Sequence, residues 1–136
     1  MKILKFLEKN CSTFSLVEPN IGYSDFPYEL PNLKVDLQDY LRKSEKVTSW
    51  PGTKCKVAKG EEKPVLHNYE CSRESIKYLK KYNSFWDIEE QMDIAFYKTF
   101  KCILYTISHE EMLVVDLAFW GNFFEYTNCV LIKSRS

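Results

Sequence analysis

Residues 84–98 read SFWDIEEQMDIAFYK, and their apolar spacing decides the fold that the sequence predicts. Apolar side chains recur at i, i+3, i+7, i+10 and i+11, which is the stripe of an amphipathic helix packed on one face. They are Phe85, Ile88, Met92, Ala95 and Phe96. Ser84 precedes the stripe and suits a helix N-cap. The pattern therefore predicts a helix over residues 84–98.

After this segment the apolar period changes from 3.6 to 2. Residues 99–107 are rich in β-branched and aromatic side chains, as strands are. Leu113, Val115, Leu117 and Phe119 alternate on one face. Gly121 and Asn122 suit a two-residue hairpin turn. The sequence therefore predicts three antiparallel strands, the last two being Val114 to Trp120 and Phe123 to Ile132.

Three weaker patterns lie upstream. The first nine residues fit a short helix or a strand, with Ile3, Leu4 and Leu7 inward. A stripe of Leu33, Leu37, Tyr40 and Leu41 predicts a helix that begins after Asn32 and ends near Lys46. Ser72 can cap a further helix that buries Ile76 and Leu79.

The fold class that these elements predict is α+β, a single domain over residues 1–136. Its helices pack on one side of a C-terminal antiparallel meander of about three strands, which N-terminal segments can extend.

Composition narrows the class of protein. The chain has 136 residues, of which 45% are hydrophobic and 28% charged, as in an ordinary globular domain. A sequence pI near 6.7 argues against general affinity for nucleic acid.

The five cysteines are odd in number and widely spaced, which predicts no disulfide and a reducing compartment. No apolar run approaches bilayer length, and no signal-peptide core opens the chain. We therefore expect a cytoplasmic protein.

The charge of the chain is divided unevenly. Residues 1–81 carry fifteen Lys or Arg against eleven Asp or Glu. Residues 82–132, which are rich in aromatics, carry eight acids against two lysines. An acidic surface beside exposed aromatic rings suits a basic protein partner.

The candidate binding residues are acidic and aromatic. On the predicted helix, Trp86, Glu90, Asp93 and Tyr97 fall at i, i+4, i+7 and i+11, opposite the apolar stripe. Asp116 and Trp120 share a face of the predicted strand, and Glu125 lies on the next one. Exposed, these seven residues would form a protein-binding surface with aromatic anchors. The alternative places Trp86 and Tyr97 in the core, with the acids at its rim.

Catalytic and metal-binding motifs are missing from the sequence. The two histidines lack partners at metal-ligand spacing, since His109 is followed by two glutamates and no second histidine. The four glycines are scattered singly and form no phosphate loop. We therefore predict no catalytic, cofactor-binding or metal-binding residue.

These observations predict a non-enzymatic protein-binding module. The expected role is an inhibitor or immunity-type protein that neutralises a basic effector, such as a nuclease toxin, through its acidic, aromatic surface. One alternative is a small-molecule-binding protein or small enzyme with an aromatic-lined pocket between helices and sheet. A second is a single-stranded RNA binder that uses the Lys-rich region 54–81. Dimerisation through an exposed edge strand is left open.

Overall fold

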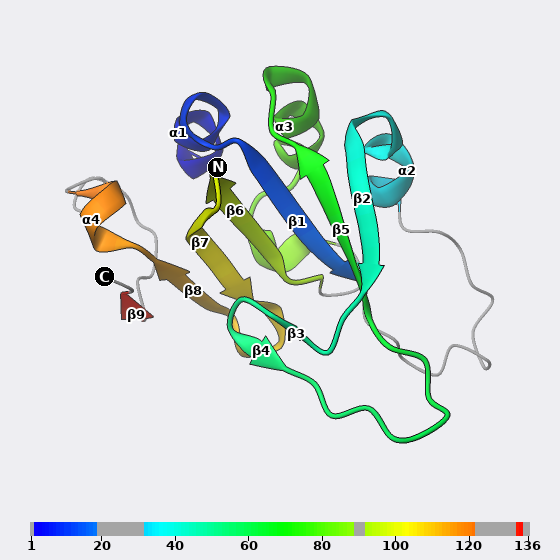
Figure 1. Cartoon of the computed structure of the whole chain (residues 1–136). Helices are drawn as coiled ribbons and strands as arrows, with labels where there is room; N and C mark the ends of the chain where they lie inside the picture. The colour runs from blue at the N-terminus through cyan, green and yellow to red at the C-terminus, as the bar shows by residue number, and fades with distance from the viewer. Residues whose placement is uncertain (1, 19–31, 89–91, 122–132, 135–136) are drawn as a thin grey trace.

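The computed structural model describes residues 2–18, 32–88, 92–121 and 133–134. In these residues the dominant element is a sheet with the order β2-β5-β1-β6-β7-β8-β9 (Figure 1). The first six strands pair antiparallel, and the short β9 joins β8 in parallel. A separate two-stranded hairpin, β3–β4, lies beside the sheet.

The strands of the large sheet come from the whole length of the chain. They are β1 (Thr13–Glu18), β2 (Leu41–Lys46), β5 (Val65–Glu70), β6 (Ile94–Lys98), β7 (Lys101–Ile107), β8 (Met112–Val115) and β9 (Lys133–Ser134). The hairpin consists of β3 (Ser49–Trp50) and β4 (Thr53–Lys54).

The helices are short. They are α1 (Lys2–Asn10), α2 (Asn32–Asp36), α3 (Arg73–Leu79) and α4 (Leu117–Trp120), with single 3₁₀ turns η2 (Gln38–Tyr40), η3 (Phe85–Asp87) and η5 (Ser108–Glu110). None of the described helices is long and apolar enough to cross a membrane.

The predicted fold class was wrong. A large antiparallel sheet with few short helices replaces the expected helices on a three-stranded C-terminal meander. The predicted helix over 84–98 is a 3₁₀ turn at its start and strand β6 at its end. Strand β6 is central in the sheet, between β1 and β7, and both of its faces are covered, so that Ile94 and Phe96 are buried on one face and Ala95 on the other. A strand covered on both faces shows a continuous apolar run, which periodicity cannot separate from a helix.

Several local predictions are confirmed and others are not. The helix predicted after Ser72 forms as α3, and Ser72 caps it through a reciprocal capping box with Ser75. The start of the chain, for which helix and strand were both left open, is helix α1. The helix predicted from Asn32 stops early, and Leu41–Lys46 is strand β2 instead. The strand predicted over Val114 to Trp120 ends at Val115, where α4 follows. The strand predicted over 123–132, and its turn at Asn122, lie outside the described residues.

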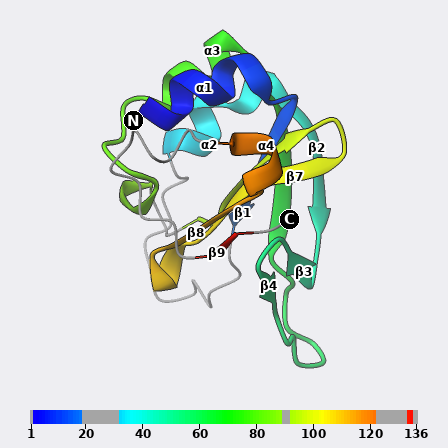
Figure 2. The ribbon, with the colours of Figure 1, turned by 90° about the vertical axis from the view of Figure 1, so that its left-hand side faces the viewer.

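The main core lies between one face of the sheet and the helices. Figure 2 shows α1, α2 and α3 on the same side of the sheet. Alternate sheet residues face them, and Phe14 packs against Tyr69 and Phe96 on the two flanking strands. The helices supply Ile3, Leu4, Leu7, Leu33, Ile76 and Leu79, and Leu37 joins them from the position after α2; each is at most 2% exposed. The apolar faces of these helices are thereby buried.

The opposite face of the sheet carries a smaller apolar cluster. Ala95, Tyr105 and Val114 are neighbours across β6, β7 and β8. Gly52, at the turn of the β3–β4 hairpin, lies against the ring of Tyr105. Its φ of +87° and the absence of a side chain allow this close approach. The hairpin therefore covers part of the second face.

A disulfide joins Cys11 and Cys71, contrary to the prediction from the odd number of cysteines. Cys11 precedes β1 and Cys71 follows β5, and these strands pair with Thr13 opposite Glu70. The register brings the two Cα atoms to 6.1 Å, which is within disulfide range. The number of cysteines alone does not show whether two of them will lie side by side at the ends of paired strands.

Candidate functional site

The structure describes five of the seven predicted binding residues, and these five do not lie together on one exposed face. Glu90 and Glu125 lie outside the described residues. Asp116 and Trp120 are only 2% and 3% exposed, so the prediction that Asp116 faces solvent was wrong. It assumed that the strand continued through residue 116, whereas α4 begins there and folds these residues onto the core.

Asp116 has a structural role at the start of α4. Its Oδ1 accepts a hydrogen bond from the Ala118 backbone N–H at 3.1 Å, and its Oδ2 lies 2.6 Å from Lys101 Nζ. The Lys101 ammonium and the backbone donors hold the pKa of Asp116 below its ordinary value, against the opposing effect of desolvation. The buried carboxylate is thus compensated by its partners.

Asp93 and Tyr97 are also used within the fold. Asp93 accepts hydrogen bonds from Trp50 Nε1 and from the Ser108 backbone N–H, at 2.8 and 2.7 Å. The Tyr97 hydroxyl lies 3.4 Å from Ser15 Oγ, and burial raises its pKa. Trp86 is half-buried against the main core. These residues therefore make separate contacts within the fold. The helix predicted over residues 84–98, which would have placed them on one face, does not form.

The described surface is predominantly basic. Among residues whose exposure is described, sixteen Lys or Arg are exposed, against eight Asp or Glu. Several other carboxylates are half-buried or buried in ion pairs and hydrogen bonds, as Asp93 and Asp116 are. This surface suits an anionic partner better than a cationic one.

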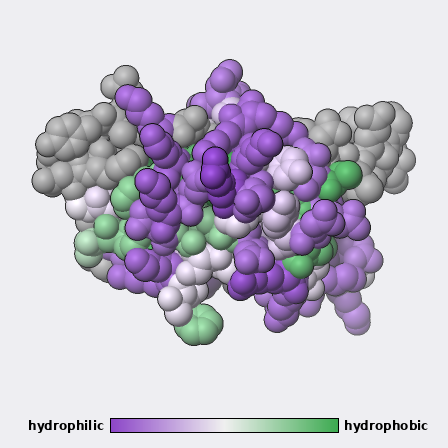
Figure 3. Space-filling model, turned by 90° about the horizontal axis from the view of Figure 1, so that it is seen from above, coloured by the Kyte–Doolittle hydropathy of each residue, from purple (hydrophilic) through white to green (hydrophobic). Residues whose placement is uncertain are grey.

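Basic side chains concentrate where α1 and α3 meet the turn between β6 and β7. Residues 2–10, 73–81 and 98–101 carry nine Lys or Arg and two Glu, a net charge of +7. Lys81 and Lys101 pair with Asp36 and Asp116, which brings the total to +5. We call these three segments the basic end. Seen from above in Figure 3, the molecule is largely hydrophilic.

One aromatic ring stands out on the basic end. Phe100 occupies the β6–β7 turn and is 97% exposed, the most exposed large apolar side chain among the described residues. Lys98 and Lys101 flank it as a cross-strand pair. Water contact over a whole phenyl ring is unfavourable, and burial of such a ring stabilises by about 1.5–3 kcal/mol. The ring is therefore available to a partner.

The turn that presents Phe100 is held in place. Thr99 has φ of +57°, a conformation costly for a β-branched residue. Its backbone N–H donates a 2.9 Å hydrogen bond to Ser12 Oγ. Lys98 Nζ lies 5.4 Å above the centre of the Phe119 ring, a cation–π contact. These contacts pre-organise the turn.

The Lys-rich region 54–81 does not form one surface. Lys54 lies in β4 and Lys56, Lys59 and Lys63 follow it, whereas Arg73 and Lys77 lie on α3. Strand β5 separates the two groups, and Figure 1 shows them at opposite ends of it. Binding of single-stranded RNA by the region 54–81 stays a prediction.

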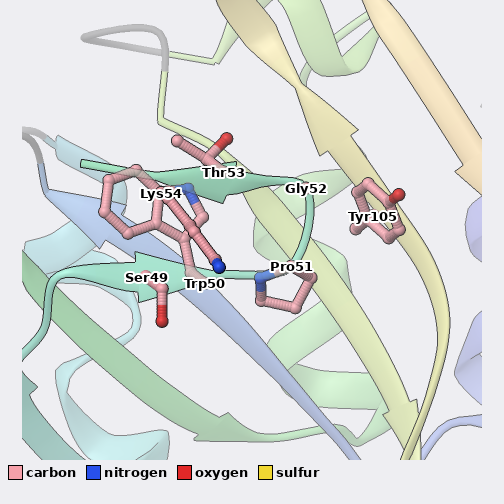
Figure 4. A pocket seen from close by; sticks show the side chains of 7 residues that line it. All are labelled: Ser49, Trp50, Pro51, Gly52, Thr53, Lys54 and Tyr105. Carbon is pink, nitrogen blue, oxygen red and sulfur yellow. The ribbon is translucent and has the colours of Figure 1, made fainter.

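A second feature is a pocket of about 500 Å³ at the β3–β4 hairpin (Figure 4). It is lined by Ser49, Trp50, Pro51, Gly52, Thr53, Lys54 and Tyr105. Two aromatic rings, three hydroxyls and one ammonium group thus share a cavity. The buried Thr53 Oγ1 has no hydrogen-bond partner among the described residues. Such a lining suits a small ligand that carries an anionic group.

No metal cluster is found in the described ranges, where no three or more His, Cys, Asp or Glu side chains lie together. Comparisons with protein-family models, characterised proteins and solved structures found no match. Function must therefore be argued from geometry. Phe100 was missed because the sequence placed it inside the strand-like run 99–107, and only the pairing of Lys98 with Lys101 puts it in the turn.

Proposed function

We propose that the chain is a protein-binding module whose Phe100 inserts into an apolar socket rimmed by carboxylates. The observation that carries the proposal is the nearly complete exposure of this ring on a constrained turn within the basic end. Interface energy usually concentrates in a few anchors. A pre-organised turn reduces the entropy lost on binding.

The charge of the proposed partner is opposite to the charge that the sequence predicted. A basic partner, such as a nuclease toxin, was expected from an acidic, aromatic surface, and the described residues offer no such surface. The net charge of the basic end instead attracts acidic surfaces and raises the rate of association. Whether the partner is a toxin, and whether the chain inhibits it, remain predictions.

A photocrosslinking experiment tests this proposal directly. Phe100 is replaced by benzoylphenylalanine, which keeps the aromatic ring, and the protein is irradiated in lysate of its source cells. We expect a discrete adduct that protease destroys and nuclease leaves intact. Excess wild-type chain should compete with it, whereas Phe100→Ala should not. An adduct that nuclease removes would overturn the proposal in favour of nucleic acid.

A matched control uses the same crosslinker at Lys59, which is exposed in the loop at the other end of the molecule. Its yield should be far lower than at residue 100. The double variant Lys5→Glu, Lys77→Glu changes two exposed charges of the basic end. It should slow adduct formation at low salt and have less effect at high salt. Equal yields at both crosslinker positions would contradict the proposal.

Small-molecule binding is a second candidate function, favoured by the hairpin pocket. Trp50 and Tyr105 can contact a ring or sugar, and Lys54 can pair with an anionic group. Screening of anionic metabolites by thermal shift tests this. A true ligand should raise the melting temperature of the parent and of Phe100→Ala, and should lose its effect with Lys54→Ala. No shift with any compound would favour protein binding alone.

The Cys11–Cys71 disulfide bears on the compartment in which the protein works. The sequence predicts the cytoplasm, whereas disulfides persist in oxidising compartments. Cytoplasmic function therefore requires these two thiols to be reduced in the cell. Alkylation in intact cells followed by mass spectrometry distinguishes the two states, since modified Cys11 and Cys71 would support a cytoplasmic location.

A further inference from the structure

A polar array lies at the edge of the sheet beside β2, away from the surfaces discussed above. Ser44 Oγ lies 2.7 Å from His67 Nδ1, and His67 Nε2 lies 3.2 Å from Glu18 Oε2. Lys34 Nζ donates to both oxygens of the same carboxylate, at 2.9 and 3.2 Å. A hydroxyl, an imidazole and a carboxylate are thus connected in series.

Strand register creates this array. Ser44 and His67 are directly opposite on β2 and β5. On the other side of β5, Glu18 of β1 is opposite Val65, two residues from His67, and so shares its face. The three residues lie 23 and 49 positions apart in the sequence. Sequence spacing alone could not have shown them as a group.

The proton positions follow from the partners. A carboxylate can only accept, so the His67 proton resides on Nε2 and is donated to Glu18. Nδ1 is then an acceptor for the Ser44 hydroxyl. His67 is 5% exposed, and burial is the main cause that lowers its pKa, which favours the neutral ring that can accept a proton. The usual roles of the two ring nitrogens in a serine triad are exchanged.

A groove lies beside this array. A cavity of about 200 Å³ is lined by Lys34, Val35, Gln38, Leu41, His67 and Tyr69. Val35 and Leu41 are large apolar side chains at 51% and 41% exposure. An apolar group of a few carbons would fit against them, next to the imidazole. Ser44 itself is exposed on β2, so a substrate carbonyl can reach its oxygen.

We propose that Ser44, His67 and Glu18 form a hydrolytic site for carboxylic esters of short acyl chains. Ser44 Oγ attacks the ester carbonyl carbon while His67 Nδ1 takes its proton. The bond to the alcohol oxygen breaks, and the alcohol leaves with the proton from His67. Water then attacks the acyl carbon of the acyl-serine and gives a proton to His67 Nδ1. The bond from this carbon to Ser44 Oγ breaks, His67 returns the proton to Ser44 Oγ, and the carboxylic acid leaves.

The remaining groups have supporting roles. Glu18 fixes the tautomer of His67 and stabilises its charged form, and Lys34 holds Glu18 in place. Among the described strands β2 has β5 as its one neighbour, so the outward backbone N–H groups of β2 are open to the oxyanion. No metal or cofactor is needed for this reaction. The site is independent of Phe100.

Two measurements on the full chain test the proposal. A fluorophosphonate probe should label Ser44, as located by peptide mass spectrometry, and His67→Asn should abolish the labelling. With p-nitrophenyl butyrate the parent should release a burst of one nitrophenolate per chain. Ser44→Ala should lower the rate roughly 100-fold or more. Leu41→Lys should reduce the preference for butyrate over acetate.

The control is Ser84→Ala. Ser84 Oγ donates to Asp87 Oδ2 at 3.2 Å, so it is a serine whose hydroxyl is bound to a carboxylate instead of an imidazole. This variant should hydrolyse the ester and react with the probe as the parent does. Ser44 is exposed, and its alanine variant should therefore fold, as a thermal melt can verify. Parental hydrolysis by Ser44→Ala, or equal labelling of Ser44 and Ser84, would overturn the proposal.

Discussion

Trp50 Nε1 donates a 2.8 Å hydrogen bond to Asp93 Oδ2, which ties the β3–β4 hairpin to the residue that precedes β6. The other oxygen of this carboxylate accepts from the Ser108 backbone N–H at 2.7 Å. The Asp93 backbone carbonyl also accepts from Val17 N at 3.0 Å. Asp93 is therefore a junction of three chain segments, although the sequence had placed it in a binding surface.

Asp93→Ala should destabilise the fold. It leaves the Trp50 and Ser108 donors without their acceptor, and each half-buried donor left unpaired costs about 1–3 kcal/mol. We expect the free energy of unfolding in urea to fall by roughly 2–4 kcal/mol. Glu110→Ala is the control, since Glu110 is exposed on η5 and should change stability by less than about 0.5 kcal/mol. Equal stability of the two variants would contradict the junction role.

Gly52→Ala and Gly60→Ala form a matched pair. Both glycines have positive φ, +87° and +90°, so both substitutions carry a backbone cost of about 1 kcal/mol. At Gly52 an added Cβ would also collide with the Tyr105 ring, 2.8 Å from its Cδ2, whereas at Gly60 nothing lies within 4 Å. Overpacking adds about 1–3 kcal/mol. Denaturant unfolding should therefore show a larger loss for Gly52→Ala, and an equal loss would place the hairpin away from the sheet.

The Asp116–Lys101 pair predicts a pH dependence. Because the folded-state pKa of Asp116 lies below its ordinary value of 3.8, the folded chain binds fewer protons than the unfolded chain near that pH. The stabilisation is present above 3.8 and is lost as pH falls through the lower folded pKa. The stability difference between parent and Asp116→Asn should therefore be constant from pH 7 to 5 and shrink at more acidic pH. A constant difference down to pH 2 would contradict this.

Reduction of the Cys11–Cys71 disulfide should weaken the fold. The bond closes a loop with a sequence separation of 60 residues. In the chain-entropy model such a crosslink stabilises by about 4 kcal/mol. Addition of reductant should lower the free energy of unfolding of the parent by about this amount. It should not change the free energy of unfolding of the double variant Cys11→Ser, Cys71→Ser. A parent insensitive to reductant would show that the bond does not form in solution.

Some of the fold could be predicted because its signals are local. Ser72 and the apolar pair Ile76 and Leu79 lie within one or two helical turns, and they specify α3 wherever it packs. The β-branched and aromatic residues of β7 likewise predicted a strand. Strand β2 was missed because its residues are mostly exposed at the sheet edge and show no apolar alternation.

The sequence by itself determined an apolar content sufficient for a core, the helix α3 and the strand character of β7. The tertiary structure alone decided that residues 94–98 are a strand rather than a helix, because backbone pairing with β1 and β7 and burial on both sheet faces outweigh helical periodicity. It also decided which side chains meet. Strand register determines three of the features described above. They are the Cys11–Cys71 disulfide, the contact of Ser44 with His67 and the exposure of Phe100. Register is set by pairing between distant segments, so no local pattern could reveal it.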